Sequence, residues 1–154
     1  MAAIFLDAMS EFSSEKALVD RFLTSLRRAR LPWDCAQVSR EFFYHCGRAD
    51  IVAINAEGQI IAVEAKLKKW RVALHQAYRN TCFANLSYVL LPKSVALHAR
   101  RFLSEFERRR VGICYLEGDE ARVLQEPCAV EPLQPWLSVR ALESMSVQHD
   151  ARTA

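Results

Sequence analysis

Residues 48–66 of the chain are RADIVAINAEGQIIAVEAK, and this stretch decides the fold. The segments 49–55 and 59–65 are apolar on both faces, and Ala56-Glu57-Gly58 between them has the residue types of a tight turn. We therefore predict two strands joined by a hairpin. Because strands that lack a polar face are covered on both sides, we expect them near the centre of a sheet flanked by helices.

Three charged side chains, Asp50, Glu64 and Lys66, interrupt these otherwise apolar strands. The tight hairpin returns Glu64 to the level of Asp50 on the neighbouring strand. Side chains alternate along a strand, so Glu64 and Lys66 are expected on one face and Ala65 on the other. The spacing predicts two carboxylates and one amine at one end of two adjacent central strands.

This combination of charges suits a divalent cation. Burying charge is costly unless the charges are paired or hold a metal. Asp50, Glu64 and a backbone carbonyl, that of Ala65, match the oxygen ligands of Mg²⁺, and Mn²⁺ is expected to substitute. Such an ion polarises a phosphodiester oxygen and lowers the pKa of a bound water. Lys66 would orient or deprotonate that water, or neutralise charge developing on the phosphorane. The alternative is a solvated ion pair on a strand and an aspartate in a turn.

The rest of the chain surrounds this hairpin with helices and further strands. Helical periodicity covers 13–29, 68–84 and 94–109, and strand patterns cover 40–45, 87–91, 111–116 and 121–125. The predicted order is α-β-β-β-α-β-α-β-β. This order defines an α/β (α+β) fold with three layers, in which helices flank a mixed central sheet.

The length predicts one domain over 1–154, since 154 residues bury a single core of their own. Its core is expected over 13–125. Three prolines follow that region, so 126–147 is expected to be an irregular wrap with a short helix near 137–145. The tail, 148–154, is expected to fray.

Composition excludes several classes of protein. The chain is 51% apolar and 25% charged, which rules out fibrous and disordered classes, and its net charge of +3 does not by itself indicate nucleic acid. No apolar run approaches the roughly 20 residues of a membrane span, and the first residues lack the basic region of a secretory signal. We expect a cytoplasmic protein with no membrane contact. Its five cysteines lack metal-ligand spacing and are expected to be buried free thiols.

The segment 47–92, through Asp50 and Glu64-x-Lys66, resembles the PD-(D/E)xK nuclease superfamily. The core of that superfamily, the restriction-endonuclease-like fold, has the order α-β-β-β-α-β, and the resemblance in element order covers about 15–91. It implies that Asp50 and Glu64 bind the divalent metal and that Lys66 serves the attacking water. Ala49 stands where the motif often has proline.

The resemblance implies further site residues. The family often carries an acidic residue on the first helix, where Glu15 is the best match and Glu41 on the first strand is the alternative. The helix after the third strand often contributes a glutamine, here Gln76. One subset has tyrosine four residues later, but this chain has Asn80, so we do not assign it to that subset. Basic residues near the site would contact the phosphates: Arg48, Lys68, Lys69, Arg71 and Arg79.

The sequence is therefore expected to encode a Mg²⁺-dependent endonuclease acting on DNA. Because the chain has no base-reading module, it is expected to recognise DNA structure, such as a junction, flap or end, or to be directed by a partner protein. Junction-resolving members of similar size work as dimers, which implies a homodimer. The alternative is a non-catalytic nucleic-acid-binding or assembly module that keeps the fold.

Overall fold

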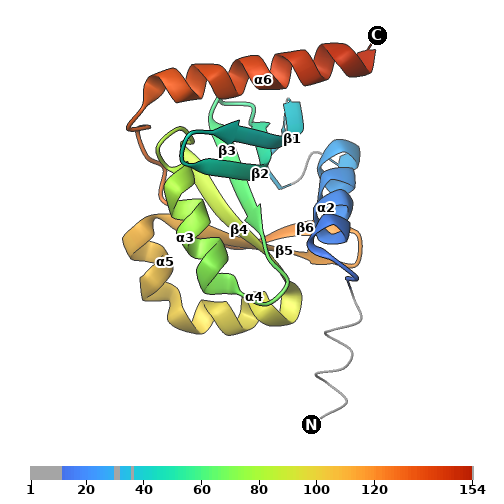
Figure 1. Cartoon of the computed structure of the whole chain (residues 1–154). Helices are drawn as coiled ribbons and strands as arrows, with labels where there is room; N and C mark the ends of the chain where they lie inside the picture. The colour runs from blue at the N-terminus through green and yellow to red at the C-terminus, as the bar shows by residue number, and fades with distance from the viewer. Residues whose placement is uncertain (1–11, 30–31, 36, 154) are drawn as a thin grey trace.

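The computed structural model describes residues 12–29, 32–35 and 37–153 and contains one six-stranded sheet with the order β1-β2-β3-β4-β5-β6 (Figure 1). The strands are β1 (Gln37–Tyr44), β2 (Gly47–Ile54), β3 (Ile60–Ala65), β4 (Leu86–Pro92), β5 (Val111–Glu117) and β6 (Glu120–Gln125). The two hairpins at the sheet edges are antiparallel and β2 pairs antiparallel with β3, whereas β3, β4 and β5 run parallel. The predicted mixed sheet is confirmed.

Helices cover both faces of this sheet. They are α2 (Glu15–Ala29), α3 (Trp70–Asn80), α4 (Lys93–Ala99), the short 3₁₀ helix η1 (Arg100–Phe102), α5 (Leu103–Arg109) and α6 (Pro135–Thr153). The order through β6 is the predicted α-β-β-β-α-β-α-β-β, with a 3₁₀ turn inside the third helical segment. The fold-class prediction is confirmed as an α+β domain in three layers.

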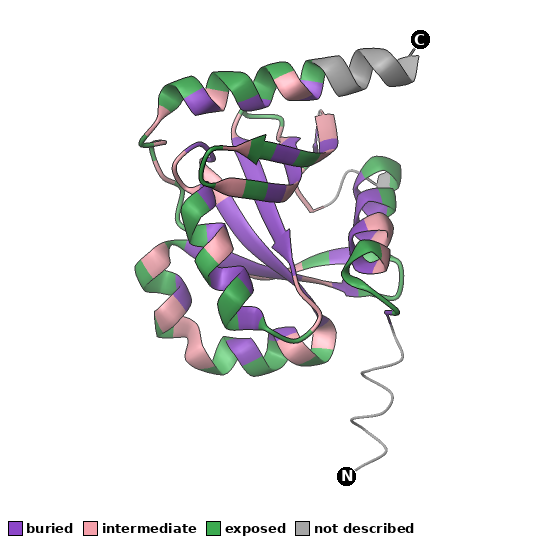
Figure 2. Cartoon of the chain, viewed as in Figure 1, coloured by how far each residue is buried: buried purple, intermediate pink, exposed green. Residues whose placement is uncertain are grey.

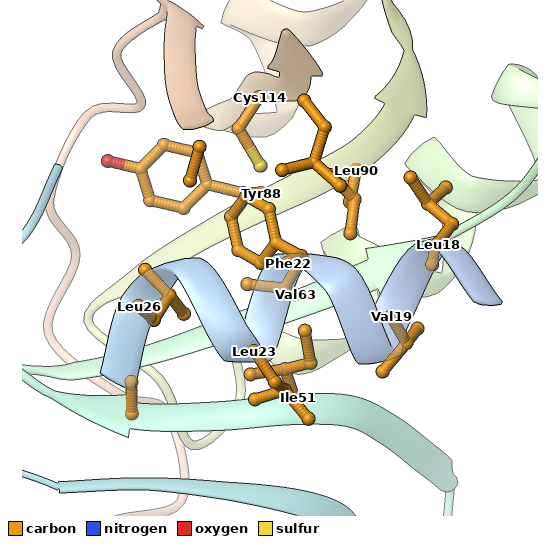
Figure 3. Close-up of a cluster of buried hydrophobic side chains, with 14 of the residues drawn as sticks. Leu18, Val19, Phe22, Leu23, Leu26, Ile51, Val63, Tyr88, Leu90 and Cys114 are labelled. Atoms are coloured by element: carbon orange, nitrogen blue, oxygen red, sulfur yellow. The ribbon is translucent and has the colours of Figure 1, made fainter. Parts of the chain in front are cut away.

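One apolar stripe of α2 packs against the central strands. Phe22 and Leu26 of α2 contact a cluster that contains Ile51, Val63 and Leu90 (Figure 3). On the opposite face, α3 packs against β4 and β5, and α6 packs against β1 and β2. The central strands β3 and β4 are almost entirely buried (Figure 2), so a charged group on them lies in apolar surroundings.

The predicted continuous helix over 94–109 is wrong. The chain forms α4, leaves the α-helix at η1 and resumes as α5, because Phe102 has φ −112° and ψ 38°. The Phe102 ring stacks on Trp70 of α3 with centroids 5.3 Å apart. At this position the chain makes a ring contact with a distant helix and does not continue as one α-helix. The predicted helix over 68–84 is likewise shorter, since residues 81–83 form a turn.

The predicted irregular wrap is present over 126–134, but the helix that follows it, α6, extends through the tail that was expected to fray from 148. This helix runs from Pro135 to Thr153 and is much longer than the short helix expected near 137–145. Proline favours the first turn of a helix because its missing N–H has no intrahelical partner there. The Gln134 N–H, donating to the Cys82 carbonyl at 2.9 Å, fixes the start of α6 against the end of α3.

All five cysteines are free thiols, as predicted, but Cys46 and Cys128 are exposed rather than buried. Within the described part of the chain, no helix is both long and apolar enough to cross a membrane.

Candidate active site

The carboxylates of Asp50 and Glu64 meet where β2 separates from β3. Pairing of these strands ends at Ile51 and Val63, so Asp50 and Glu64 are the next residues on either side. Asp50 Oδ2 accepts a hydrogen bond from the Ala65 N–H at 2.9 Å, in place of a backbone acceptor. The Asp50 side chain is 15% exposed, and Glu64 is 2% exposed. The two strands thus bring both acids together at low exposure.

The pKa of Glu64 is raised well above its ordinary value. Burial is the largest cause, the negative charge of Asp50 adds to it, and a hydrogen bond between the two carboxyl groups also favours the protonated form. Without a cation, the pair therefore retains a proton to higher pH than a solvent-exposed carboxyl group does. A cation that both carboxylates could share would replace it.

A buried hydrogen-bond chain orients Glu64 from α3 and β1. Asn80 Nδ2 donates to Glu64 Oε1 at 2.8 Å, and Tyr44 Oη donates to Asn80 Oδ1 at 2.6 Å. Asn80 is fully buried. Because the tyrosine hydroxyl occupies the amide oxygen, the amide nitrogen faces Glu64. The donated hydrogen bond favours the ionised carboxylate and opposes the effect of burial on its pKa.

Sequence reasoning missed the role of Asn80 and Tyr44. Asn80 lies on the helical stripe of Ala73 and Ala77, which faces the sheet. A polar residue on that apolar stripe is a signal that could have been noticed, since a buried amide needs partners. Tyr44 carries no comparable signal, because its partner comes from a distant helix.

Arg48 joins Asp50 to Glu41, the alternative acidic residue. Its guanidinium lies 3.1 Å from Asp50 Oδ1 and 3.6 Å from Glu41 Oε1. The β1–β2 register skips Glu41 and Asp50, which lie between the pairs Arg40–Ile51 and Phe42–Ala49. Glu41 has a φ of 53°, which is unusual for a residue other than glycine. Backbone strain of this kind concentrates at functional sites.

Lys66 is held by Glu15, the first residue of α2, rather than by the two carboxylates. Lys66 Nζ lies 3.4 Å from Glu15 Oε1. Strand β3 ends at Ala65, and although the Lys66 N–H still donates to the Leu90 carbonyl of β4 at 3.1 Å, the Lys66 side chain reaches Glu15 of α2. The structure therefore links Glu15 to the motif through Lys66.

The remaining predicted site residues, Gln76 and four basic side chains, differ in their burial and in their contacts. Gln76 is half-buried on α3, one turn before Asn80, which is the residue of that helix that contacts Glu64. Lys68 and Lys69 are exposed between β3 and α3. Arg71 pairs with Glu105 at 3.2 Å and lies over Trp70, so it braces α3 against α5. Arg79 donates to the Cys46 carbonyl at 3.0 Å.

The donor set fits Mg²⁺ better than a softer metal. Two carboxylates face each other, and across the described residues no group of three or more His, Cys, Asp or Glu gathers into a metal cluster. Mg²⁺ is often held by one or two carboxylates and keeps several waters, whereas structural zinc sites need four protein ligands.

Comparison with solved structures supports the fold. SPO1766, a protein of unknown function from Silicibacter pomeroyi, matches with a TM-score of 0.64 at 13% identity, over 93% of this chain and 90% of that one. A repair endonuclease from Pyrococcus abyssi has a TM-score of 0.48 at 16% identity, over 70% of this chain and 49% of that one. SfsA from Pyrococcus furiosus, in complex with Ca²⁺, has a TM-score of 0.34 at 13% identity, over 62% and 55%. No family model and no curated protein matches the sequence. The first likeness concerns fold alone.

Proposed function

We propose that this protein is a metal-dependent endonuclease that hydrolyses DNA phosphodiester bonds. One observation carries the proposal: Asp50 and the almost fully buried Glu64 face each other on central strands, and the pKa of Glu64 is raised as a result. Two adjacent buried carboxylates destabilise a fold unless they share a proton or a cation. A cation bound between them would remove that cost.

Each residue of the motif has a chemical task in this proposal. Asp50, Glu64 and the Ala65 carbonyl would hold Mg²⁺ or Mn²⁺, which would polarise a phosphodiester oxygen and lower the pKa of a bound water. Lys66 Nζ orients the attacking water or neutralises charge on the phosphorane, and Glu15 keeps that amine in place. The attacking water gives up one proton as its oxygen bonds to phosphorus, the bond from phosphorus to the leaving sugar oxygen breaks, and that sugar oxygen takes up one proton.

Lys68 and Lys69 are the basic residues best placed to contact the flanking phosphates, because they follow the motif directly and are exposed. We further propose that the enzyme recognises DNA structure or is directed by a partner protein, and that it acts as a homodimer.

The test is cleavage of linear, single-stranded, flap and four-way-junction DNA by the pure protein with Mg²⁺ or Mn²⁺. Asp50→Ala and Glu64→Ala should abolish cleavage and remove metal binding measured by calorimetry, while both variants stay folded. Lys66→Ala should lose cleavage but keep metal binding. Wild-type protein that binds no divalent cation would overturn the proposal.

A non-catalytic nucleic-acid-binding module is the second candidate. It is favoured by the way the Asp50 carboxylate is already satisfied by Arg48 and the Ala65 N–H. This candidate predicts DNA binding with neither cleavage nor calorimetric heat from Mg²⁺.

A further inference from the structure

Helix α6 exposes large apolar side chains that the core of this chain does not use. Trp136, Val139 and Leu142 are 51%, 53% and 37% exposed. The opposite side of the helix is buried in the core, through Leu137, Ala141 and Met145. Figure 1 shows α6 lying along the outside of the molecule, against the β1–β2 hairpin. A helix that is apolar on two sides is typical of one that is covered on both.

The angular order of the residues shows which of them face away from the core. Successive residues of an α-helix are turned by about 100°. Val139 comes two residues after the fully buried Leu137, and Glu143 comes two residues after the fully buried Ala141, so both point almost directly outward. We call the exposed residues that follow Pro135 in this helix the outer face of α6, which comprises Trp136, Val139, Arg140, Leu142, Glu143 and Ser146.

Two opposite charges accompany the apolar side chains on the outer face of α6. Arg140 and Glu143 are its charged members, and in the described part of the chain neither forms an ion pair. The helical angle places both on one flank of Val139 and Leu142 on the other flank. Because the two charges cancel, the face has no electrostatic attraction for a nucleic acid or an anionic membrane.

A second copy of this chain complements both the apolar and the charged part of this face. A twofold axis brings the same patch of two copies together, so that residue i meets residue j and j meets i. When two α6 helices run antiparallel about an axis at the level between residues 141 and 142, Arg140 of one copy comes opposite Glu143 of the other, and the reverse pair forms as well. The axis keeps each flank on its own side, so these opposite charges meet on one flank and the two Leu142 side chains lie together on the other.

We propose that the outer face of α6 joins two copies of this chain as an antiparallel helix pair. Val139 and Leu142 form the apolar centre, and the two ion pairs between Arg140 and Glu143 set the register. Trp136 extends the contact at each end, where its ring already stacks on His45 with centroids 5.8 Å apart. This inference rests on the proposed function only in naming how its homodimer forms. Because α6 packs on the hairpin that carries Asp50, the dimer would hold two candidate active sites at a fixed spacing.

The first experiment measures the mass of the full chain by sedimentation equilibrium in EDTA and without DNA. Wild type should pass from monomer to dimer with a Kd of about 1–100 µM, because a contact through one helix is a small interface. Val139→Glu should raise this Kd by about tenfold or more, since it places two carboxylates in the apolar centre. Val72→Glu, the same change at a 43% exposed position on α3, is the matched control and should leave the Kd unchanged. Circular dichroism should show that both variants keep the fold.

Charge reversal tests the antiparallel register. Arg140→Glu and Glu143→Arg should each raise the Kd about tenfold, because each variant puts like charges opposite each other at two places. The double variant Arg140→Glu/Glu143→Arg restores opposite charges at both places and should return to the wild-type Kd. An interface with a different protein gives no reason for such a rescue.

Three results would each overturn the inference. These are a wild type that stays monomeric at about 100 µM, a dimer that Val139→Glu leaves intact, and a double variant that remains as weak as the single ones. The measurements are independent of cleavage. A monomer that cleaves DNA with Mg²⁺ would overturn this inference and leave the proposed metal-dependent cleavage standing, whereas a dimer that binds no divalent cation would do the reverse.

Discussion

At the scale of the residue, Glu64 controls a pH-dependent part of the stability. Its pKa is raised in the folded protein by burial and by Asp50. The folded state therefore binds this proton more tightly than the unfolded chain. Its contribution is fully present below the unfolded-state pKa and is lost as pH rises through the folded-state pKa. Metal-free protein should thus become less stable from mildly acidic to alkaline pH.

Glu64→Gln should remove this loss of stability. The amide keeps an oxygen for Asn80 and offers a donor to Asp50, but it carries no charge to bury. In EDTA, we expect the variant to be more stable than wild type by about 1–3 kcal/mol near pH 9, with the gap closing towards acid. Thermal unfolding at several pH values measures the difference. Parallel pH profiles for the two proteins would contradict the account.

Asn80 positions Glu64, so removal of the Asn80 side chain should affect both the stability of the fold and the metal affinity of the Glu64 carboxylate. Asn80→Ala leaves Glu64 Oε1 and the Tyr44 hydroxyl without their partner, which should cost about 1–3 kcal/mol in the free energy of unfolding. Mg²⁺ affinity should also fall, because the carboxylate loses its orientation. Urea unfolding and calorimetry measure the two effects. Val72→Ala, at an exposed position two turns earlier on α3, is the control, and an equal effect there would argue against a specific role for Asn80.

At the scale of the element, the sequence predicts a strand or helix when its physical cause lies in neighbouring residues. It misses a feature whose cause is a contact with a distant part of the chain. The hairpin at 56–58 and the burial of β2 and β3 follow from residues close together in the chain. The helical segment breaks between α4 and α5, where the Phe102 ring contacts Trp70 of α3. The apolar periodicity of this segment does not indicate the break. Helix α6 has apolar residues on both faces, so it shows no single stripe. The pairing of Lys66 with Glu15 similarly depends on where α2 docks.

Helix α6 supports the hairpin through one face only. Leu137 is fully buried in a cluster that contains Phe42 and Val52, whereas Val139 is 53% exposed. Leu137→Ala should lower the free energy of unfolding by about 2–5 kcal/mol, because it opens a cavity under the hairpin. Val139→Ala should change it by no more than about 0.5 kcal/mol. Chemical denaturation of both variants tests this, and equal losses would mean that α6 packs differently.

At the scale of the whole molecule, charge beside the motif should govern how DNA affinity depends on salt. Lys68 and Lys69 are exposed and follow the motif directly, and Arg71 forms an ion pair with Glu105. Each lost phosphate contact lowers the slope of log affinity against log salt by about 0.7–0.9. The double variant Lys68→Ala/Lys69→Ala should therefore flatten that slope, and Arg71→Ala should not. A flatter slope in Arg100→Ala/Arg101→Ala instead would place the DNA path along α4 and α5.

The central strands join every layer of the molecule, so an ion held between β2 and β3 should stabilise the whole domain. A ligand that binds only the folded state adds RT ln(1 + [L]/Kd), about 2.7 kcal/mol at a hundredfold excess over Kd. Mg²⁺ or Mn²⁺ should therefore raise the unfolding temperature of wild type by about 5 °C or more.

Asp50→Ala and Glu64→Ala should not respond, because each lacks one carboxylate. Lys66→Ala should respond like wild type, since its amine binds Glu15 and not the ion. Differential scanning calorimetry at constant ionic strength separates this from general salt effects. An equal rise in the carboxylate variants would show that the cation binds elsewhere.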